Sequence, residues 1–179
     1  MSITKKKLTE KEIQKCIYDL YKKKGYKYFS LNTFGFGQFE ADFLAIHEEN
    51  KFCVEFEIKR SRGDFHADFK KKNKHDLLKK GKYPVNQFYF VAEKGVLDIK
   101  QIPYHLGLIE VEKIPTYKTI RKKFVTRQKK QYIYDIAVMR KAKVLHQRPF
   151  PEHLLIKILT SVMYKFFENF NRSVKINER

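Results

Sequence analysis

Acidic residues are scarce in this chain, and long apolar runs are missing from it. The 179 residues include 20 Asp and Glu against 39 Lys and Arg, which gives a formal net charge of +19. A positive excess of this size predicts an acidic partner, most often nucleic acid and less often an anionic membrane surface. No apolar run approaches the ~20 residues that a membrane-spanning helix needs, so we expect no membrane span.

The sequence also lacks the patterns of several common reactions. Its two cysteines form no Cys-x-x-Cys pair, its six histidines have no metal-ligand spacing, and no Ser-His-Asp order or nucleophile elbow occurs. The glycines of residues 34–37 are followed by no Gly-Lys-Ser/Thr, which favours a turn over a phosphate-binding loop. Few cysteines and no signal peptide predict a reducing cytoplasm. The chemistry therefore rests on carboxylates and lysine.

The segment from Phe39 to Lys59 predicts a β-hairpin with an acidic face. Its second half alternates strictly, which places apolar side chains on one face and, on the other, Cys53, Glu55, Glu57 and Lys59. In the first half, Glu40 and Asp42 share one side with Leu44 and Ile46. As many as four carboxylates and one lysine therefore converge on a single face of the sheet.

Carboxylates held this close repel one another and raise one another's pKa, and Asp and Glu are depleted in strands. A divalent cation offsets the repulsion, since Mg²⁺ takes one or two carboxylates and fills its shell with water and substrate phosphate. Lys59 points the same way and can meet a phosphate oxygen or an attacking water. The competing interpretation is an exposed hairpin face with a solvated salt bridge, and the hairpin alone leaves both open.

With its context, this hairpin resembles the PD-(D/E)XK nuclease superfamily, whose signature is an acidic residue on one strand and an acidic-x-Lys triplet on the next. Asp42 and the triplet Glu57-Ile58-Lys59 match it, although no proline precedes Asp42. Within the superfamily the chain is most similar to MmcB-type DNA-repair proteins. The matching text continues through residues 61–71, the strand at 88–91 and the strand at 107–109, and the resemblance spans roughly 9–112.

The resemblance implies a fold, a cofactor and roles for single residues. The fold is α/β, a restriction-endonuclease-like mixed sheet flanked by helices, with residues 1–112 as the core. Asp42 and Glu57 ligate Mg²⁺ or Mn²⁺ with the Ile58 carbonyl, and Lys59 orients the water or neutralises the phosphate. Glu55 shares the face but lies outside the triplet. A glutamate on the first helix often joins the metal site in this superfamily, and Glu12 is the candidate.

The first predicted helix starts at about Thr9, because Thr9 and Glu12 have the spacing of a capping box. A role for Glu12 in the cap alone stays open beside the metal role. A second helical stretch follows at 61–80, where Ser61 and Arg62 come directly after the triplet. We expect both to contact the nucleic-acid backbone, together with the lysines of that stretch, Lys70, Lys71 and Lys72.

Residues 113–179 predict a basic, helical extension packed on the core. Residues 113–148 hold 12 Lys and Arg against one acid, and apolar spacing predicts a helix over 127–146 that grips DNA through phosphate contacts. Its candidate residues, with those just before it, are Lys122, Lys123, Arg127, Lys129 and Lys130. The last helix, 152–171, is strongly apolar and either packs on the sheet or makes a homodimer contact.

The sequence therefore predicts a metal-dependent DNA endonuclease that acts in repair or recombination and recognises DNA shape more than sequence. Three alternatives remain. The first is a catalytically inactive module with a nuclease-like fold that binds branched or single-stranded nucleic acid. The second is a nuclease directed at RNA, and the third is a role at a membrane surface.

Overall fold

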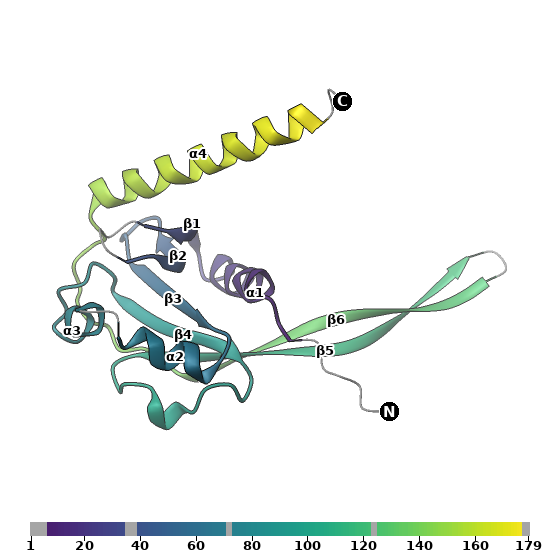
Figure 1. The fold of residues 1–179 in the computed structure, drawn as a ribbon, viewed down its shortest axis with the longest axis horizontal. Coiled ribbons are helices and arrows are strands. Elements are labelled where there is room, and N and C mark those ends of the chain that lie inside the picture. Colours follow the sequence, from purple (N-terminus) through teal and green to yellow (C-terminus); the bar gives the residue numbers. More distant parts are fainter. Residues whose placement is uncertain (1–6, 35–38, 71–72, 123–124, 177–179) are drawn as a thin grey trace.

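The computed structural model describes residues 7–34, 39–70, 73–122 and 125–176. They form an α/β fold with one six-stranded mixed sheet and helices on both of its faces (Figure 1), which confirms the predicted class. In chain order the elements are α1 (Glu10–Lys22), β1 (Tyr26–Thr33), β2 (Ala41–His47), β3 (Cys53–Lys59), α2 (Arg62–Asp68), α3 (Lys74–Lys79), β4 (Gln87–Glu93), the 3₁₀ turn η1 (Ile99–Gln101), β5 (Gly107–Lys122), β6 (Val125–Arg140) and α4 (Glu152–Ile176).

The strands lie side by side in sequence order. β1, β2 and β3 form an antiparallel meander, β3, β4 and β5 are mutually parallel, and β6 returns antiparallel to β5. Every residue of β3 is buried, as expected for a strand covered on both faces. The predicted hairpin of β2 and β3 is confirmed, and it places the acidic stretch in the middle of the molecule.

Helix α1 covers one face of the sheet. Its capping box is formed as the sequence predicts, with Thr9 accepting from the Glu12 N–H and Glu12 accepting from the Thr9 N–H. Ile13 and Ile17 pack on a cluster that includes Val54 and Phe56 of β3. The apolar side of the β3 alternation therefore faces α1.

The opposite face is covered by α2, α3 and the first turns of α4. Phe65, Leu78 and Leu155 from these helices share one cluster with Leu44 and Phe88 of the sheet. The stretch predicted as one helix over 61–80 is thus two short helices. They lie on the face to which Glu55, Glu57 and Lys59 point.

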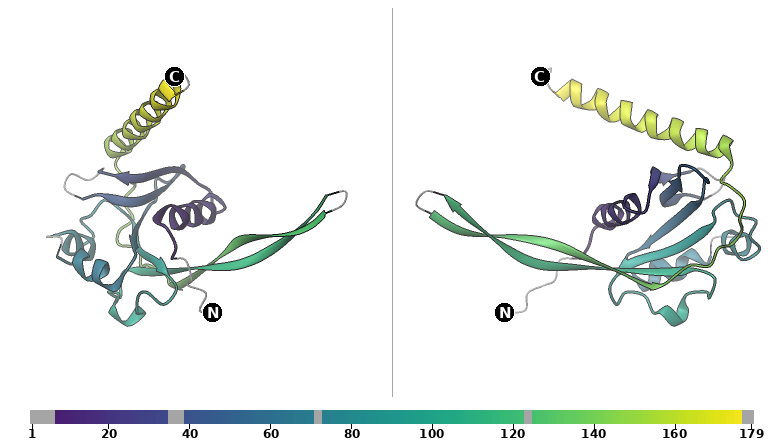
Figure 2. Two further views of the ribbon diagram at one scale, coloured as in Figure 1. Left: turned by 45° about the vertical axis from the view of Figure 1, so that its right-hand side comes forward. Right: turned by 180° about the vertical axis from the view of Figure 1, so that it is seen from behind.

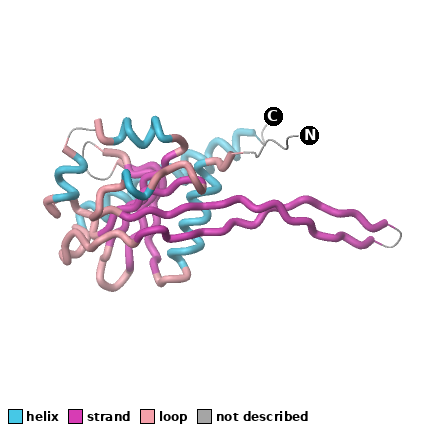
Figure 3. The backbone as a smooth tube through the Cα atoms, turned by 90° about the horizontal axis from the view of Figure 1, so that it is seen from below, coloured by secondary structure: helices cyan, strands magenta, loops and turns pink. Residues whose placement is uncertain are grey.

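The helix predicted over 127–146 is wrong, because β6 runs from Val125 to Arg140. β5 and β6 each have 16 residues and pair from Leu108–Arg140 to Lys122–Val125. Figures 2 and 3 show that the outer part of this antiparallel pair, called here the ribbon (residues 112–122 and 125–135), leaves the body as two strands. Its β-branched and aromatic residues favour a strand. The predicted boundary between 112 and 113 falls inside β5.

Helix α4 begins after Pro149 and Pro151, close to the predicted start, and extends well past 171. Leu155 and Ile158 are buried against the sheet, whereas most of the following apolar side chains are exposed. Figure 1 shows the helix running past β1 and away from the body. Burial against the core, one of the two predicted roles, is therefore limited to the first turns.

Candidate active site

Asp42 and Glu57 lie opposite each other on neighbouring strands. Phe43 of β2 pairs with Phe56 of β3. Asp42 precedes Phe43 and Glu57 follows Phe56, so the antiparallel register brings Asp42 across from Glu57. Asp42 Oδ2 accepts a hydrogen bond from the Ile58 N–H at 2.7 Å. Because the N–H and C=O of one strand residue point to the same edge, the Ile58 carbonyl also faces Asp42. The structure thus brings the three predicted metal ligands together.

The Asp42 carboxyl group titrates near neutral pH. Burial and the charge of Glu57 raise the pKa of Asp42 to about 7, although the Ile58 N–H and the Lys59 ammonium act in the opposite direction. The charge of Glu10, in the first turn of α1, adds a further rise. Gln14 links the two acids by donating to Glu10 Oε1 at 3.0 Å and to the Asp42 carbonyl oxygen at 3.1 Å.

Lys59 lies in the same buried cluster and contacts two carboxylates closely, with that of Asp64 farther away at 4.0 Å. Its Nζ is 2.9 Å from Glu57 Oε1 and 3.1 Å from Asp68 Oδ1, and the side chain is 3% exposed. Asp68 in turn contacts His75 Nε2 through its second oxygen, at 2.8 Å. The predicted placement of Lys59 beside Glu57 is confirmed. Asp68, at the end of α2, and His75, in α3, were not predicted as parts of the site.

Lys74, which sequence reasoning also missed, bridges both glutamates of β3. Its Nζ lies 2.7 Å from Glu57 Oε2 and 2.9 Å from Glu55 Oε1, and its side chain has no solvent exposure. Burial acts to lower the pKa of Lys74, but Glu55 and Glu57 together raise that pKa above its ordinary value. Burial likewise opposes ionisation of Glu57, yet Lys74 and Lys59 hold the pKa of Glu57 below its usual range. Burial dominates at Glu55 and raises its pKa.

Glu12 has other partners. Its carboxylate accepts from Lys113 Nζ at 2.5 Å and from the Tyr134 hydroxyl at 2.8 Å, besides the bonds within the cap. The hydrogen bond from Lys113 and the Thr9 N–H lower the pKa of Glu12 to about 2. The structure therefore places Glu12 at the root of the ribbon, and the helix glutamate whose charge reaches Asp42 is Glu10.

The structure describes three of the five residues predicted to contact nucleic acid in the stretch 61–72. Ser61 is the N-cap of α2 and accepts from the Asp64 N–H at 3.1 Å, while Arg62 is exposed and donates to the Val96 carbonyl at 3.3 Å. Lys70 is exposed as well. Lys71 and Lys72 lie outside the described residues. Ser61 and Arg62 therefore stand at the start of the helix that carries Asp68.

The remaining predicted contacts lie on or next to the ribbon. Lys129 and Lys130 are exposed on β6. Lys129 stands directly opposite Lys118, and Lys130 opposite Tyr117. Lys122 and Arg127 belong to β5 and β6, and Lys123 lies outside the described residues. Like charges placed opposite each other destabilise a strand pair, so the Lys118–Lys129 pair costs the isolated ribbon stability.

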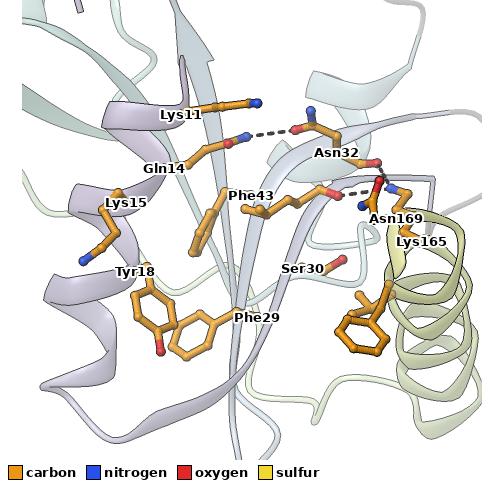
Figure 4. Close-up of a pocket in the computed structure, with 13 residues that line it drawn as sticks. Lys11, Gln14, Lys15, Tyr18, Phe29, Ser30, Asn32, Phe43, Lys165 and Asn169 are labelled. Carbon is orange, nitrogen blue, oxygen red and sulfur yellow. Dashed lines mark hydrogen bonds between the residues drawn. The ribbon is translucent and has the colours of Figure 1, made fainter. Parts of the chain in front are cut away.

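A groove lies between α1, β1 and α4, on the other side of β2 from the acidic cluster. Its volume is about 690 Å³, with aromatic walls from Tyr18, Phe29 and Phe43. Figure 4 shows Lys165 of α4 reaching the chain at Asn32, to whose carbonyl it donates at 2.7 Å. This contact fixes the middle of α4 against the end of β1.

Two features are absent from the residues that the structure describes: a cluster of metal ligands and a membrane-spanning helix. No cluster of three or more His, Cys, Asp and Glu side chains in these ranges is arranged to hold a metal ion. None of the helices in the described part of the chain is both long and apolar enough to cross a membrane.

Comparison with known proteins establishes the fold alone. No family model matches the chain, and no curated protein matches it. Among solved structures, the SPO1766 protein of unknown function from Silicibacter pomeroyi is similar, with a TM-score of 0.60 over 89% of this chain and 90% of that chain. The sequence identity is 15%. The chain therefore shares its α/β architecture with that protein.

Proposed function

We propose that this protein is a metal-dependent endonuclease that hydrolyses phosphodiester bonds in DNA. The observation that carries the proposal is the position of Asp42 and Glu57, each one residue beyond the Phe43–Phe56 pair of β2 and β3, with the Lys59 ammonium 2.9 Å from Glu57. An acidic pair with an adjacent lysine, held at the end of a buried hairpin, is the arrangement that the PD-(D/E)XK resemblance implies.

The residues of this site fit a divalent cation. The pKa of Asp42 is raised by burial and by the charge of Glu57, and a cation between the two carboxylates would remove that repulsion. Asp42, Glu57 and the Ile58 carbonyl would hold Mg²⁺ or Mn²⁺, with the rest of the shell left to water and phosphate. When bound, such an ion lowers the pKa of a coordinated water and stabilises negative charge on the phosphate.

Lys59 supplies a positive charge that the chain itself holds in place. Glu57 and Asp68 accept from its ammonium at 2.9 and 3.1 Å, and an ammonium has three donors. The third donor serves to orient the attacking water or to neutralise the pentacovalent phosphorus species. Asp68 therefore acts as a positioning residue for Lys59.

The ribbon is the main DNA-binding element in this proposal. A two-stranded antiparallel ribbon fits the major groove of B-DNA, and lysines such as Lys118, Lys129 and Lys130 would contact phosphates. Phosphate contacts position a protein without reading base sequence. Binding would depend strongly on salt, because each neutralised phosphate releases counterions. Arg62, exposed at the start of α2, would contact the backbone near the cut.

The experiment is cleavage of labelled linear, nicked, forked and four-way DNA with Mg²⁺ or Mn²⁺, beside an EDTA control and an RNA of equal length. Asp42→Asn and Lys59→Ala should abolish cleavage while DNA binding persists. Cleavage in EDTA, or full activity of Asp42→Asn, would overturn the proposal. Preference for the RNA would reassign the substrate.

One observation favours a second candidate, a nucleic-acid-binding module that does not cut. The Lys74 ammonium lies within 2.9 Å of both Glu55 and Glu57, so the chain supplies its own cation where the carboxylates gather. In that case the acidic cluster is structural, and the ribbon alone carries the activity. Tight DNA binding by the wild type, with no cleavage in either metal, would favour this candidate.

A further inference from the structure

The distal part of α4 exposes an apolar seam. The helix rests on the body through one stripe, with Leu155 and Ile158 buried and Lys165 bonded to the end of β1. An adjoining stripe has side chains that are 37–62% exposed, namely Ile156, Leu159, Met163, Phe166 and Phe170. A helix with two adjoining apolar stripes is normally covered along both.

The spacing of the seam is that of a helix that pairs with another helix. Its five residues follow one another at intervals of three, four, three and four, which is the alternation of a and d positions in a heptad repeat. Ile156, Met163 and Phe170 take the a positions, whereas Leu159 and Phe166 take the d positions. The residues buried against the body, Leu155 and Ile158, fall outside these positions. Phe166 also lines the groove beside α1 and β1, yet its side chain stays 62% exposed.

The exposed area of the seam is that of a small specific interface. Its two phenylalanines, Phe166 and Phe170, are 62% and 53% exposed and at about 200 Å² each present roughly 230 Å². With the aliphatic residues of the seam, each copy presents about 500 Å², so two copies reach the ~1,000 Å² that a specific interface buries at its lower limit.

We propose that α4 pairs antiparallel with α4 of a second copy of this chain. Antiparallel pairing follows from charge, because each copy carries +19 and α4 leaves its body near its own N-terminus (Figure 1). A 25-residue helix is about 37 Å long, so antiparallel pairing holds the two bodies several Debye lengths apart. It sets Met163 against Phe166 and Leu159 against Phe170 of the second copy. The interface is isologous and closed.

The test is the mass of the full-length protein by size-exclusion chromatography with light scattering, over a range of concentrations. The wild type should be a dimer. Met163→Lys should weaken association by about 100-fold or more, because it places two charges in the apolar seam. Tyr164→Lys is the matched control, since Tyr164 is the neighbouring residue, is 71% exposed and lies off the seam. This variant should remain a dimer.

Both substituted side chains are exposed, so neither change threatens the monomer fold, which circular dichroism verifies. A wild type that is monomeric at every concentration overturns the proposal, even if another protein later proves to bind the seam. Equal weakening by both variants overturns it as well. Neither outcome depends on cleavage, so failure of the dimer proposal and failure of the proposed nuclease function can be distinguished.

Disulfide cross-linking tests the orientation. Cys16 and Cys53 are buried, so variants with one cysteine added in the seam report only on α4. An equal mixture of Leu159→Cys and Phe170→Cys should yield the mixed cross-linked dimer, and either variant alone should yield little. Cross-linking of each variant with itself, and none in the mixture, would contradict antiparallel pairing.

Discussion

Replacing Lys74 with Met removes the charge that pairs two buried glutamates and keeps a side chain of similar length. In the wild type the Lys74 ammonium contacts Glu55 and Glu57 with no exposure to solvent. Breaking a buried ion pair in this way costs about 3–5 kcal/mol. For a domain of this size, each kcal/mol shifts the melting temperature by about 2–4 °C, so we expect a drop of roughly 6–20 °C.

The loss should depend on pH. Without Lys74, burial and mutual repulsion raise the pKa of Glu55 and Glu57 in the folded state above the unfolded value. A carboxyl group of this kind penalises folding as the pH rises from its unfolded pKa, near 4.3, through its folded pKa. The stability gap between wild type and Lys74→Met should therefore be largest at pH 8 and should narrow toward pH 5.

Urea unfolding followed by circular dichroism at pH 8, 6 and 5 measures the gap. Lys129→Met is the control, since Lys129 is exposed on the ribbon and its loss should stay within about 0.5 kcal/mol. A Lys74→Met protein within about 1 kcal/mol of wild type at pH 8 would show that the Lys74 charge does not stabilise the buried glutamates. So would a larger gap that does not change with pH.

Three further predictions concern the site and the ribbon. Asp42→Asn should stabilise the fold at pH 8 by up to about 4 kcal/mol, because the raised pKa of Asp42, about 7, penalises folding increasingly as the pH rises from the unfolded pKa to that value. The gain should vanish by pH 4 in urea unfolding, and a less stable variant at pH 8 would contradict it. Glu12→Gln should cost about 1 kcal/mol and leave cleavage unchanged; since the pKa of Glu12 is lowered to about 2, its contribution is present above pH 4.5 and lost as the pH falls toward 2. A tenfold loss of cleavage would return Glu12 to the site. Lys129→Ala and Lys130→Ala should each reduce the slope of log K against log salt by roughly 0.9, and an unchanged slope in titrations with labelled DNA would exclude phosphate contacts there.

The hairpin of the site was predictable because its information is local. The alternation through Glu55, Glu57 and Lys59 fixes the face of each side chain, and an antiparallel turn brings Asp42 to the neighbouring strand. The α1 cap was predictable for the same reason, since Thr9 and Glu12 are three residues apart. Each of these features depends on residues that lie close together in the sequence, and the periodicity of a single strand or helix determines their spacing.

The partners of the cluster could not be predicted in the same way. Lys74, Asp68 and His75 reach β3 only because α2 and α3 pack on that face, and the lysines of residues 70–80 look alike in sequence. The roles of Glu10 and Glu12 could be distinguished only from the residues that each of them contacts in the folded protein. Glu12 meets Lys113, which is 101 residues away.

The ribbon was misassigned because two periods coexist in it. Ile133, Ile136 and Ala137 have helical spacing, whereas Tyr132, Tyr134, Ile136 and Val138 alternate at period two. Pairing with β5 decides the outcome, since Val111 and Ile109 receive Ile136 and Val138 as partners. The exposure of α4 could not be predicted either, because the sequence does not show how few of its turns are buried against the sheet.

Titration calorimetry of Mn²⁺ binding tests the claim that Asp42 and Glu57 form a cation site. It would use wild type and Asp42→Asn in buffers of different ionisation enthalpy. We expect the wild type to bind Mn²⁺ and Asp42→Asn to bind it at least about tenfold more weakly. Binding should release a proton at pH 6, where Asp42 with its pKa of about 7 is largely protonated, and less at pH 8. Equal affinity in the two proteins, or no binding to the wild type, would contradict the claim.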